Sequence, residues 1–332
     1  MNHSSSHAVA NLGEFGLISR IAAGVSVQKS VITGIGDDAA VTALSPGMQL
    51  LTSTDMLLEG VHFRCSWHGP FLLGRKSLAV SISDIAAMGG IPRWALLSLA
   101  IPADLELEFI DDFTRGFLAM AAENGVSLIG GDTCSSSSGL TVSVTIMGEQ
   151  YPEKIVRRSG AQPDDDIWVT GTLGDAALGL KLLEGGEGGD FLRSRLLDPT
   201  PRVSAALALA EERLATSMID ISDGVLADFG HIVEQSAVGG CIFIADLPLS
   251  EPFRTKTADF PAIAHQLALS GGEDYELCFT AAPTNREKIG ECMKKCGIAV
   301  TRIGIVTSTS GVTVLNPDGS HFMPQTSGFT HF

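Results

Sequence analysis

The stretch Gly271-Gly-Glu-Asp-Tyr-Glu-Leu277 places two carboxylates, Glu273 and Asp274, between a pair of glycines and an apolar run. Similar clusters of acidic and small residues recur along the chain. The other carboxylates in such clusters are Asp37, Asp38, Asp55, Asp84, Asp132, Asp220 and Asp223. Each cluster ends or interrupts an apolar run, which predicts that it lies at the end of a helix or strand and faces a shared cleft.

These anionic groups repel one another unless hard cations lie between them. Ligand sets made only of oxygen suit magnesium, which keeps some of its waters and shares its coordination sphere with substrate phosphates. The acidic clusters therefore predict an enzyme that handles phosphate groups with the help of divalent metal ions.

The composition agrees with this prediction. A chain of 332 residues is long enough for two domains, and 45% hydrophobic with 18% charged residues is typical of a globular protein. The net charge of -16 disfavours binding to nucleic acid or to an anionic membrane. A protein of this charge needs cations at any site that binds a polyphosphate.

The cysteines and the terminal segment predict a cytoplasmic protein. The six cysteines are scattered, without a Cys-x-x-Cys pair, as expected for unpaired thiols in a reducing compartment. The first 12 residues lack the apolar core of a secretory signal, and no window holds 18 consecutive apolar residues, so no membrane association is expected.

The pattern of elements predicts an α+β protein of two domains. Residues 1–11 are expected to be disordered, residues 12–149 to form an N-terminal domain and residues 150–332 a C-terminal domain, because the composition turns polar from 149 to 166. The acidic run 164–166 is expected to be solvated. Helices and strands mix without strict alternation, which favours α+β domains over a doubly wound sheet. Helices are expected at 12–23, 71–88, 105–124, 175–183, 201–214, 225–234 and 285–296, and strands at 31–35, 48–54, 94–101, 127–129, 140–148, 167–170, 218–221, 241–245, 277–280, 301–306 and 312–315.

Two familiar phosphate motifs are matched only superficially. Residues 34–39 fit Gly-x-Gly-x-x-Ala, but no long helix is expected to follow, and two carboxylates would face the pyrophosphate. Residues 69–77 have glycines at P-loop spacing, but one residue too many precedes Lys76, and Gly69-Pro70 is expected only to open a helix. A conventional nucleotide loop is therefore not predicted.

The order of the acidic motifs carries a resemblance that covers residues 13–332. The segments concerned are Gly36-Asp-Asp-Ala-Ala-Val41, Ser53-Thr-Asp55, Glu59-Gly-Val-His-Phe63, Ser83-Asp-Ile-Ala-Ala-Met-Gly89, Gly130-Gly-Asp-Thr133, Arg158-Ser-Gly160, Asp220-Ile-Ser-Asp-Gly224 and Gly271-Gly-Glu-Asp-Tyr-Glu-Leu277. Together they resemble the thiamine-monophosphate kinase family, part of the superfamily of aminoimidazole ribonucleotide synthetase and selenophosphate synthetase. Residues 59–63 and 271–277 are the more discriminating segments, whereas the Gly-Asp-Asp and Gly-Gly-Asp pieces occur across the superfamily.

The resemblance implies a two-domain PurM-like architecture. An N-terminal mixed sheet-and-helix domain would bind ATP and magnesium and form a homodimer, and a C-terminal α/β domain would follow it. The implied activity is direct, in-line transfer of the γ-phosphoryl group of ATP to thiamine monophosphate, which gives thiamine diphosphate and is the last step of its biosynthesis. ATP would be the co-substrate, and several Mg²⁺ ions would assist the transfer.

The resemblance also implies roles for individual residues. The implied magnesium ligands are Asp38, Ser53, Thr54, Asp55, Asp84, Asp132, Asp220 and Asp223; the implied ATP contacts are Gly131, Asp132, Arg158 and Ser222; and the implied substrate contacts are His62, Glu273 and Thr326. Two positions depart from the family pattern, because Thr326 replaces an aromatic residue suited to the substrate ring and Asn124 replaces one suited to adenine. Phe322 or Phe329 could supply the stacking instead.

Two alternative functions remain open. The chain could be another ATP-using enzyme of the superfamily with a different acceptor, or a metal-binding protein without catalytic activity. Asp37 and Asp274 could hydrogen-bond only to local amides. Single histidines such as His68 are expected to be packing or surface residues rather than metal ligands.

Overall fold

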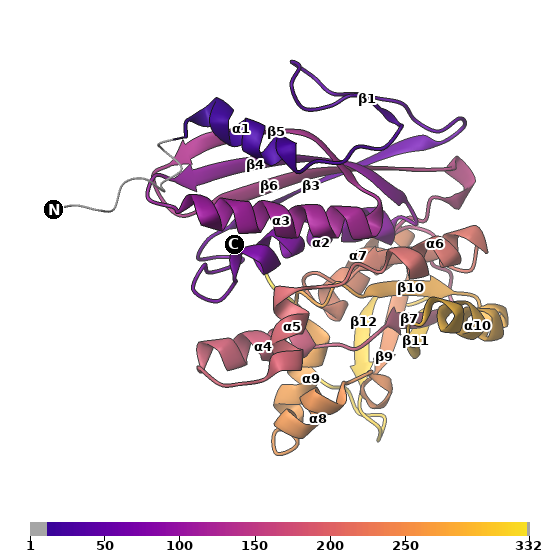
Figure 1. The fold of residues 1–332 in the computed structure, drawn as a ribbon. Coiled ribbons are helices and arrows are strands. Elements are labelled where there is room, and N and C mark those ends of the chain that lie inside the picture. Colours follow the sequence, from indigo (N-terminus) through magenta and orange to yellow (C-terminus); the bar gives the residue numbers. More distant parts are fainter. Residues whose placement is uncertain (1–11, 331–332) are drawn as a thin grey trace. The chain divides into compact units, whose positions relative to one another are not determined.

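The computed structural model describes residues 12–330, and this part of the chain forms two compact units (Figure 1). The first unit contains residues 12–85 and 91–151, and the second contains residues 86–90 and 152–330. The predicted disorder of residues 1–11 lies outside the described residues. No helix in the described range combines the length and apolar character that crossing a membrane requires.

The first unit is built on a four-stranded sheet with the order β3-β6-β4-β5. Only the β4–β5 pair is parallel. The strands are β3 (Gln49–Leu58), β4 (Ile91–Pro102), β5 (Ser127–Ser136) and β6 (Thr141–Gln150). In β6, Val142, Val144 and Ile146 are fully buried while the residues between them are partly exposed. This confirms the half-buried strand that the alternating sequence predicts.

Helices α2 (Pro70–Ala87) and α3 (Leu107–Asn124) lie side by side along this sheet (Figure 1). Their backbones approach closely at two glycines. A Cβ atom on Gly74 of α2 would overlap the backbone oxygen of Phe113, and one on Gly116 of α3 would overlap that of Phe71. Only glycine therefore fits at either point of this helix crossing.

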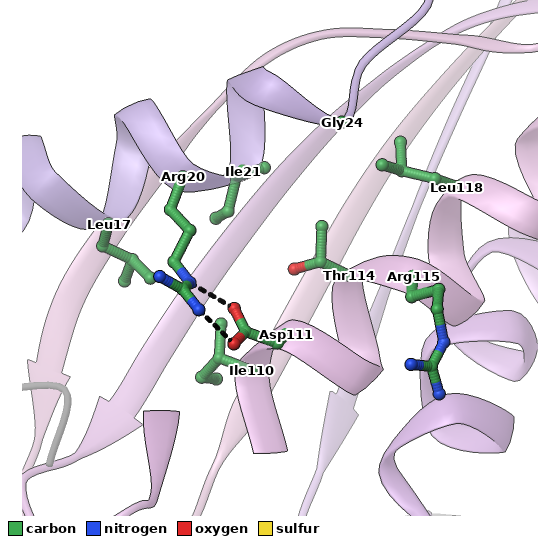
Figure 2. A pocket seen from close by; sticks show the side chains of 9 residues that line it. All are labelled: Leu17, Arg20, Ile21, Gly24, Ile110, Asp111, Thr114, Arg115 and Leu118. Atoms are coloured by element: carbon green, nitrogen blue, oxygen red, sulfur yellow. Dashed lines mark hydrogen bonds and ion pairs between the residues drawn. The ribbon is translucent and has the colours of Figure 1, made fainter. Parts of the chain in front are cut away.

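A short helix and a two-stranded ribbon complete the first unit. Helix α1 (Glu14–Ala23) and α3 border a cavity of about 340 Å³ with walls that include Ile21 and Ile110 (Figure 2). Arg20 and Asp111 form a two-pronged ion pair of 2.5 and 2.6 Å there. None of the predicted site residues lines this cavity. Strands β1 (Val31–Thr33) and β2 (Val41–Thr42) pair antiparallel.

The second unit is built on a six-stranded sheet with the order β12-β9-β11-β7-β10-β8. All neighbouring pairs are antiparallel except β12 and β9. The strands are β7 (Asp166–Thr170), β8 (Ser217–Asp220), β9 (Gly239–Phe243), β10 (Leu277–Ala281), β11 (Val300–Thr307) and β12 (Gly311–Leu315). The helices are α4 (Asp175–Glu184), α5 (Asp190–Leu197), α6 (Val203–Glu211), α7 (Val225–Ser236), α8 (Glu251–Thr257), α9 (Pro261–Ser270) and α10 (Arg286–Cys296).

Alternate residues of these strands face two different helix layers. Ile167 and Val169 of β7 pack in one core with α7 and the end of α9, whereas Trp168 between them packs in another core with α6 and α10. In β10, Cys278 belongs to the first core and Phe279 to the second. The apolar runs Ile167–Val169 of β7 and Leu277–Phe279 of β10 are continuous because both faces of the sheet are covered.

The expectations from the sequence were wrong in this unit for three helices and for one acidic run. Helices α5, α8 and α9 were not predicted, although α8 and α9 each have proline in the first turn and α8 has Ser250 as its N-cap. The acidic run 164–166 is not a solvated segment. Asp165 and Asp166 are buried, and Asp166 accepts hydrogen bonds from Arg286 at 2.6 and 2.7 Å.

The crossing of α2 and α3 gives a testable prediction. Gly74→Ala or Gly116→Ala should destabilise the protein by about 3 kcal/mol or more, because a methyl group at either position meets backbone that cannot move alone. Thermal unfolding measures the effect. Gly290→Ala is the control, since Gly290 lies within α10 with no atom near its Cβ position; it should be neutral or stabilising by up to about 1 kcal/mol. Equal stability of all three variants would contradict the close crossing.

Candidate functional site

Three of the acidic residues of the first unit lie within regular elements. Asp55 lies within β3, Asp84 within α2 and Asp132 within β5. The prediction that every cluster lies at an element end was therefore wrong for Asp55 and Asp132, whereas Asp84 lies in the last turn of α2, as the helix expected at 71–88 implies. Strand β5 extends seven residues past its predicted end at Ile129, since Ser127–Ser136 pairs along β4. Among the small residues of these clusters, Gly131 permits the close approach of β5 to β4, whereas Gly89 turns the chain after α2 with a φ of 67°.

Packing of β3 against α2 brings two carboxylates together. The Ser53 hydroxyl of β3 donates to Asp84 of α2, and the Ser81 hydroxyl of α2 donates to Asp55 of β3 at 2.6 Å. Burial, followed by the nearby negative charge of Asp84, raises the pKa of Asp55 to about 6, against the opposing hydrogen bond from Ser81. Each strand residue thus pairs with a helix residue, and the two carboxylates repel each other.

This pair suits a divalent cation in the chemistry of its donors. Carboxylate and hydroxyl oxygens are the ligands that magnesium prefers, and the repulsion that raises the pKa of Asp55 would become attraction to an ion. Within residues 12–330, no three Asp, Glu, His or Cys side chains gather at one point. Two carboxylates are enough for magnesium because it completes its shell with water and substrate phosphates.

The remaining predicted ligands of the first unit are spread over three segments. Thr54 lies on the opposite face of β3 from Ser53 and Asp55, and its hydroxyl donates to the backbone oxygen of Val144 at 3.2 Å. Asp38 is exposed in the segment between β1 and β2. No helix follows the glycines of residues 34–39, which agrees with the rejection of a dinucleotide-binding motif at this segment. Asp37 accepts from the Asp38 amide at 2.9 Å, which confirms its local role.

Gly131 and Asp132 are exposed residues of β5. A Cβ atom on Gly131 would overlap the backbone oxygen of Leu97 in β4, so this strand pair requires glycine there. The Asp132 carboxylate accepts a hydrogen bond from the Thr133 amide at 2.9 Å. Both residues therefore lie on a strand rather than on a mobile turn.

His62 follows β3 in a tight bend. Its Nδ1 atom accepts from the Leu58 amide at 3.0 Å, which places the proton of the neutral ring on Nε2, the atom suited to donate to a ligand. Phe63 beside it is buried and packs edge-on against His68. Burial, followed by the charge of Lys76, lowers the pKa of His68 to about 3. His68 is thus a neutral packing residue, as predicted.

In the second unit, the acidic residues do lie at an element end. Asp220 is the last residue of β8, and Ser222 and Asp223 lie in the loop that leads to α7. This loop pairs with the segment 271–277, because the Glu273 amide donates to the Ser222 oxygen at 2.8 Å and the Tyr275 amide to the Ile221 oxygen at 2.8 Å. The structure therefore brings together the predicted ATP contact Ser222 and the predicted substrate contact Glu273.

The other acidic residues of the segment 271–277 are structural. Asp274 is buried and accepts from the amides of Gly174 and Ala176, 100 and 98 residues away in the sequence, so it caps the start of α4 rather than bonding to amides of its own segment. Glu276 is fully buried and accepts hydrogen bonds from Arg195 and Arg202. These contacts hold the segment with Glu273 and Tyr275 at φ values of 67° and 48°, a region that side chains rarely adopt.

The predicted residue Thr326 lies in a tail that is fixed to the same region. Its backbone oxygen accepts hydrogen bonds from Ser270 and from Gln266 of α9, the latter at 3.1 Å. The Phe329 amide donates to the Asp223 oxygen at 3.0 Å. Arg158 is exposed, and its backbone oxygen accepts from Ser236.

Two polar residues that contact the predicted site residues were not predicted from the sequence. Ser81 lies three residues before Asp84 on α2, a helical spacing that the sequence already showed. Asp228 lies four residues after Gly224, and its carboxylate accepts from the amides of Ser222, Asp223 and Gly224 at 3.1 Å each. An acidic residue in the first turn of a helix was the available signal for Asp228.

Comparison with known proteins agrees with this arrangement. Residues 36–150 match the family of AIR synthase related proteins, N-terminal domain, and residues 162–315 match the corresponding C-terminal domain. The chain is 38% identical to thiamine-monophosphate kinase of Escherichia coli strain K12, covering 96% of this chain and 98% of the relative.

Two solved structures are similar over most of the chain. Thiamine-monophosphate kinase from Stenotrophomonas maltophilia K279a is 40% identical with a TM-score of 0.83, covering 92% of this chain and 96% of that one. AaThiL complexed with AMPPCP and TMP is 34% identical with a TM-score of 0.77, covering 99% of this chain and 100% of that one. The two-domain PurM-like fold is thereby confirmed.

The pair Asp55 and Asp84 predicts an unusual dependence of stability on pH. A folded-state pKa of about 6, above the ordinary value of 3.8, means that stability is lost as pH rises from about 4 to about 6 in metal-free protein. Asp55→Asn should therefore raise the unfolding temperature at pH 7.5 in the presence of a chelator, but not at pH 4. Magnesium should stabilise the unchanged protein at pH 7.5 more than the variant.

Thermal unfolding between pH 4 and pH 7.5 measures this effect, with Asp164→Asn as the control because Asp164 is exposed. The control should follow the unchanged protein at every pH. If Asp55→Asn also follows it, the two carboxylates do not repel each other as described.

Proposed function

The chain belongs to the thiamine-monophosphate kinase family, and we propose that it transfers the γ-phosphoryl group of ATP directly to the phosphate of thiamine monophosphate, giving thiamine diphosphate. The single observation that carries this proposal is the similarity over 96% of the chain to a kinase of that name. A relative that binds AMPPCP and TMP together supports the same pair of substrates.

The chemistry explains why acidic residues rather than a catalytic histidine or serine recur in this chain. The acceptor oxygen is already anionic, so the reaction needs no strong general base. The obstacle is to bring two anions together in line. Bound magnesium would neutralise this repulsion and stabilise the charge on the transferred group.

We assign magnesium binding to both units of the chain. In the first unit the proposed ligands centre on Asp55 and Asp84, with Asp38, Asp132 and the residues beside Asp55 as further candidates. In the second unit the proposed ligands are Asp220 and Asp223. The complete set that the resemblance implies is Asp38, Ser53, Thr54, Asp55, Asp84, Asp132, Asp220 and Asp223, of which the side chain of Thr54 lies on the opposite face of β3 from those of Ser53 and Asp55.

The proposed substrate contacts are those that the resemblance to the kinase family implies. For ATP they are Gly131, Asp132, Arg158 and Ser222, where the exposed guanidinium of Arg158 can donate two hydrogen bonds to a phosphate. For the thiamine part they are His62, Glu273 and Thr326. His62 would donate from Nε2, and Glu273 would pair with the positive thiazolium ring.

We further propose a cytoplasmic homodimer. The six cysteines form no disulfide, as expected in a reducing compartment. Strand β3 lies at the edge of its sheet and exposes Leu50, Met56 and Leu58 on one face. Leaving such an apolar row in water is unfavourable, and a second copy of the chain would cover it.

One assay tests the activity directly. Purified protein with ATP, magnesium and thiamine monophosphate should form thiamine diphosphate, identified by its mass, together with an equal amount of ADP. Omitting thiamine monophosphate is the control and should stop ADP formation. Consumption of ATP with a different acceptor would favour another enzyme of the superfamily, and metal uptake without ATP turnover would favour a non-catalytic protein.

Single substitutions test the proposed ligands. Asp84→Asn and Asp220→Asn should each lower kcat by about 100-fold or more, because each removes one negative ligand from a magnesium ion that stabilises the transition state. Circular dichroism should show an intact fold for both. Asp318→Asn, on an exposed turn of the second unit, is the control and should keep the full rate. Rates near those of the unchanged protein at saturating magnesium would remove both residues from the site.

A further inference from the structure

The loop of residues 221–224 has a partner for every backbone N–H and C=O group. At its first residue, the Ile221 amide donates to the Glu276 oxygen at 2.8 Å, and the Ile221 oxygen accepts from the Tyr275 amide at 2.8 Å. At its last residue, Gly224 has a φ of 115°, and a Cβ atom there would meet the backbone of Ser270, so the position requires glycine.

The middle of the loop is fixed in the same way. The Ser222 oxygen accepts from the Glu273 amide at 2.8 Å and the Asp223 oxygen from the Phe329 amide at 3.0 Å, while the Gly224 oxygen accepts from the Asp228 amide at 3.0 Å. The three remaining groups are the amides of residues 222, 223 and 224. All three donate to one oxygen, Oδ2 of Asp228, at 3.1 Å each.

Consecutive amides that converge at the start of a helix normally form a binding site for an anion such as phosphate. Here the chain fills that site with its own carboxylate, since Asp228 is only 3% exposed. The backbone of the loop consequently has no group left for a phosphate. What the loop can still offer to a ligand is the side chains of Ser222 and Asp223, next to Asp220 at the end of β8.

We infer that Asp228 is a positioning residue for the proposed magnesium site. Its carboxylate holds three backbone amides that could otherwise bind a phosphate. The loop thereby becomes a cation-binding loop, with Asp220 and Asp223 fixed as ligands. This inference rests on the proposed function, because it concerns the same magnesium site. Asp228 acts through the loop and itself touches neither metal nor substrate. Its role differs from that of Asp274, which holds the amides of Gly174 and Ala176 at α4, where no predicted ligand follows.

The test compares Asp228→Ala and Asp228→Asn with Asp165→Ala and Asp165→Asn in the full chain. Asp165 is a matched control, since it lies buried in the same unit and its carboxylate accepts from the Gln162 amide at 2.9 Å and the Thr216 hydroxyl at 2.7 Å. Asp228→Asn keeps one acceptor oxygen and should rescue part of the function.

Two readouts do not depend on activity. Hydrogen exchange of metal-free protein should show that the amides of 222–224 lose protection in Asp228→Ala and keep part of it in Asp228→Asn. Electron paramagnetic resonance with Mn²⁺ should show the dissociation constant raised about 10-fold or more in Asp228→Ala, less in Asp228→Asn and hardly at all in the Asp165 variants. In turnover, the metal concentration for half-maximal rate should rise in the same order.

A purely structural role for Asp228 would give a different result. Both pairs of variants would then lower the unfolding temperature to a similar degree, and Mn²⁺ affinity would stay unchanged at temperatures where each variant is folded. If Asp228→Ala does not fold, Asp228→Asn must bind Mn²⁺ more weakly than Asp165→Asn, and equal affinities overturn the inference. Formation of thiamine diphosphate by the unchanged protein decides the proposed function separately.

Discussion

Repulsion between neighbouring carboxylates is the constraint on which the rest of this structure depends. Asp55 and Asp84 approach each other because β3 packs against α2, and burial together with the charge of Asp84 raises the cost of charging Asp55. Hydroxyl donors from Ser53 and Ser81 offset part of that cost. The part of this cost that the hydroxyls do not offset favours a bound cation. A cation is also needed to bring the anionic acceptor close to the triphosphate of ATP. The pair of carboxylates that destabilises the metal-free fold is therefore also the pair that suits the protein to phosphoryl transfer.

The two units hold their acidic residues by different physical means. In the first unit, a strand and a helix fix the carboxylates, and the close crossing of α2 and α3 at two glycines fixes the helix. In the second unit, a loop carries them, and it is rigid because each of its backbone polar groups has a partner. A loop secured in this way loses little conformational entropy when a ligand binds.

Much of the fold could be predicted from the sequence, because local patterns determine it. The alternation of apolar residues from Leu140 to Ile146 predicted β6. The two nucleotide-binding motifs could be rejected because one has no long helix after its glycines and the other has one residue too many before its lysine. The position of Asp84 in a helix was predicted, but the positions of Asp55 within β3 and Asp132 within β5 were not, since glycine serves close packing as well as turns.

The specific pairings could not be predicted from local patterns. The contact of Ser81 with Asp55 depends on how α2 packs against β3, and the burial of Asp166 depends on Arg286 from a helix 120 residues away. Asp228 was overlooked for a different reason. Its position in the first turn of a helix is visible in the sequence, but the convergence of three amides on its carboxylate appears only when the loop is folded.

Calorimetry with a non-hydrolysable ATP analogue tests the central claim most directly, which is that acidic side chains bind this nucleotide only through divalent cations. The protein would first be stripped of metal with a chelator and then titrated with and without magnesium. The nucleotide analogue should bind tightly with magnesium and give little or no heat without it. Equal affinity in both titrations would contradict this claim.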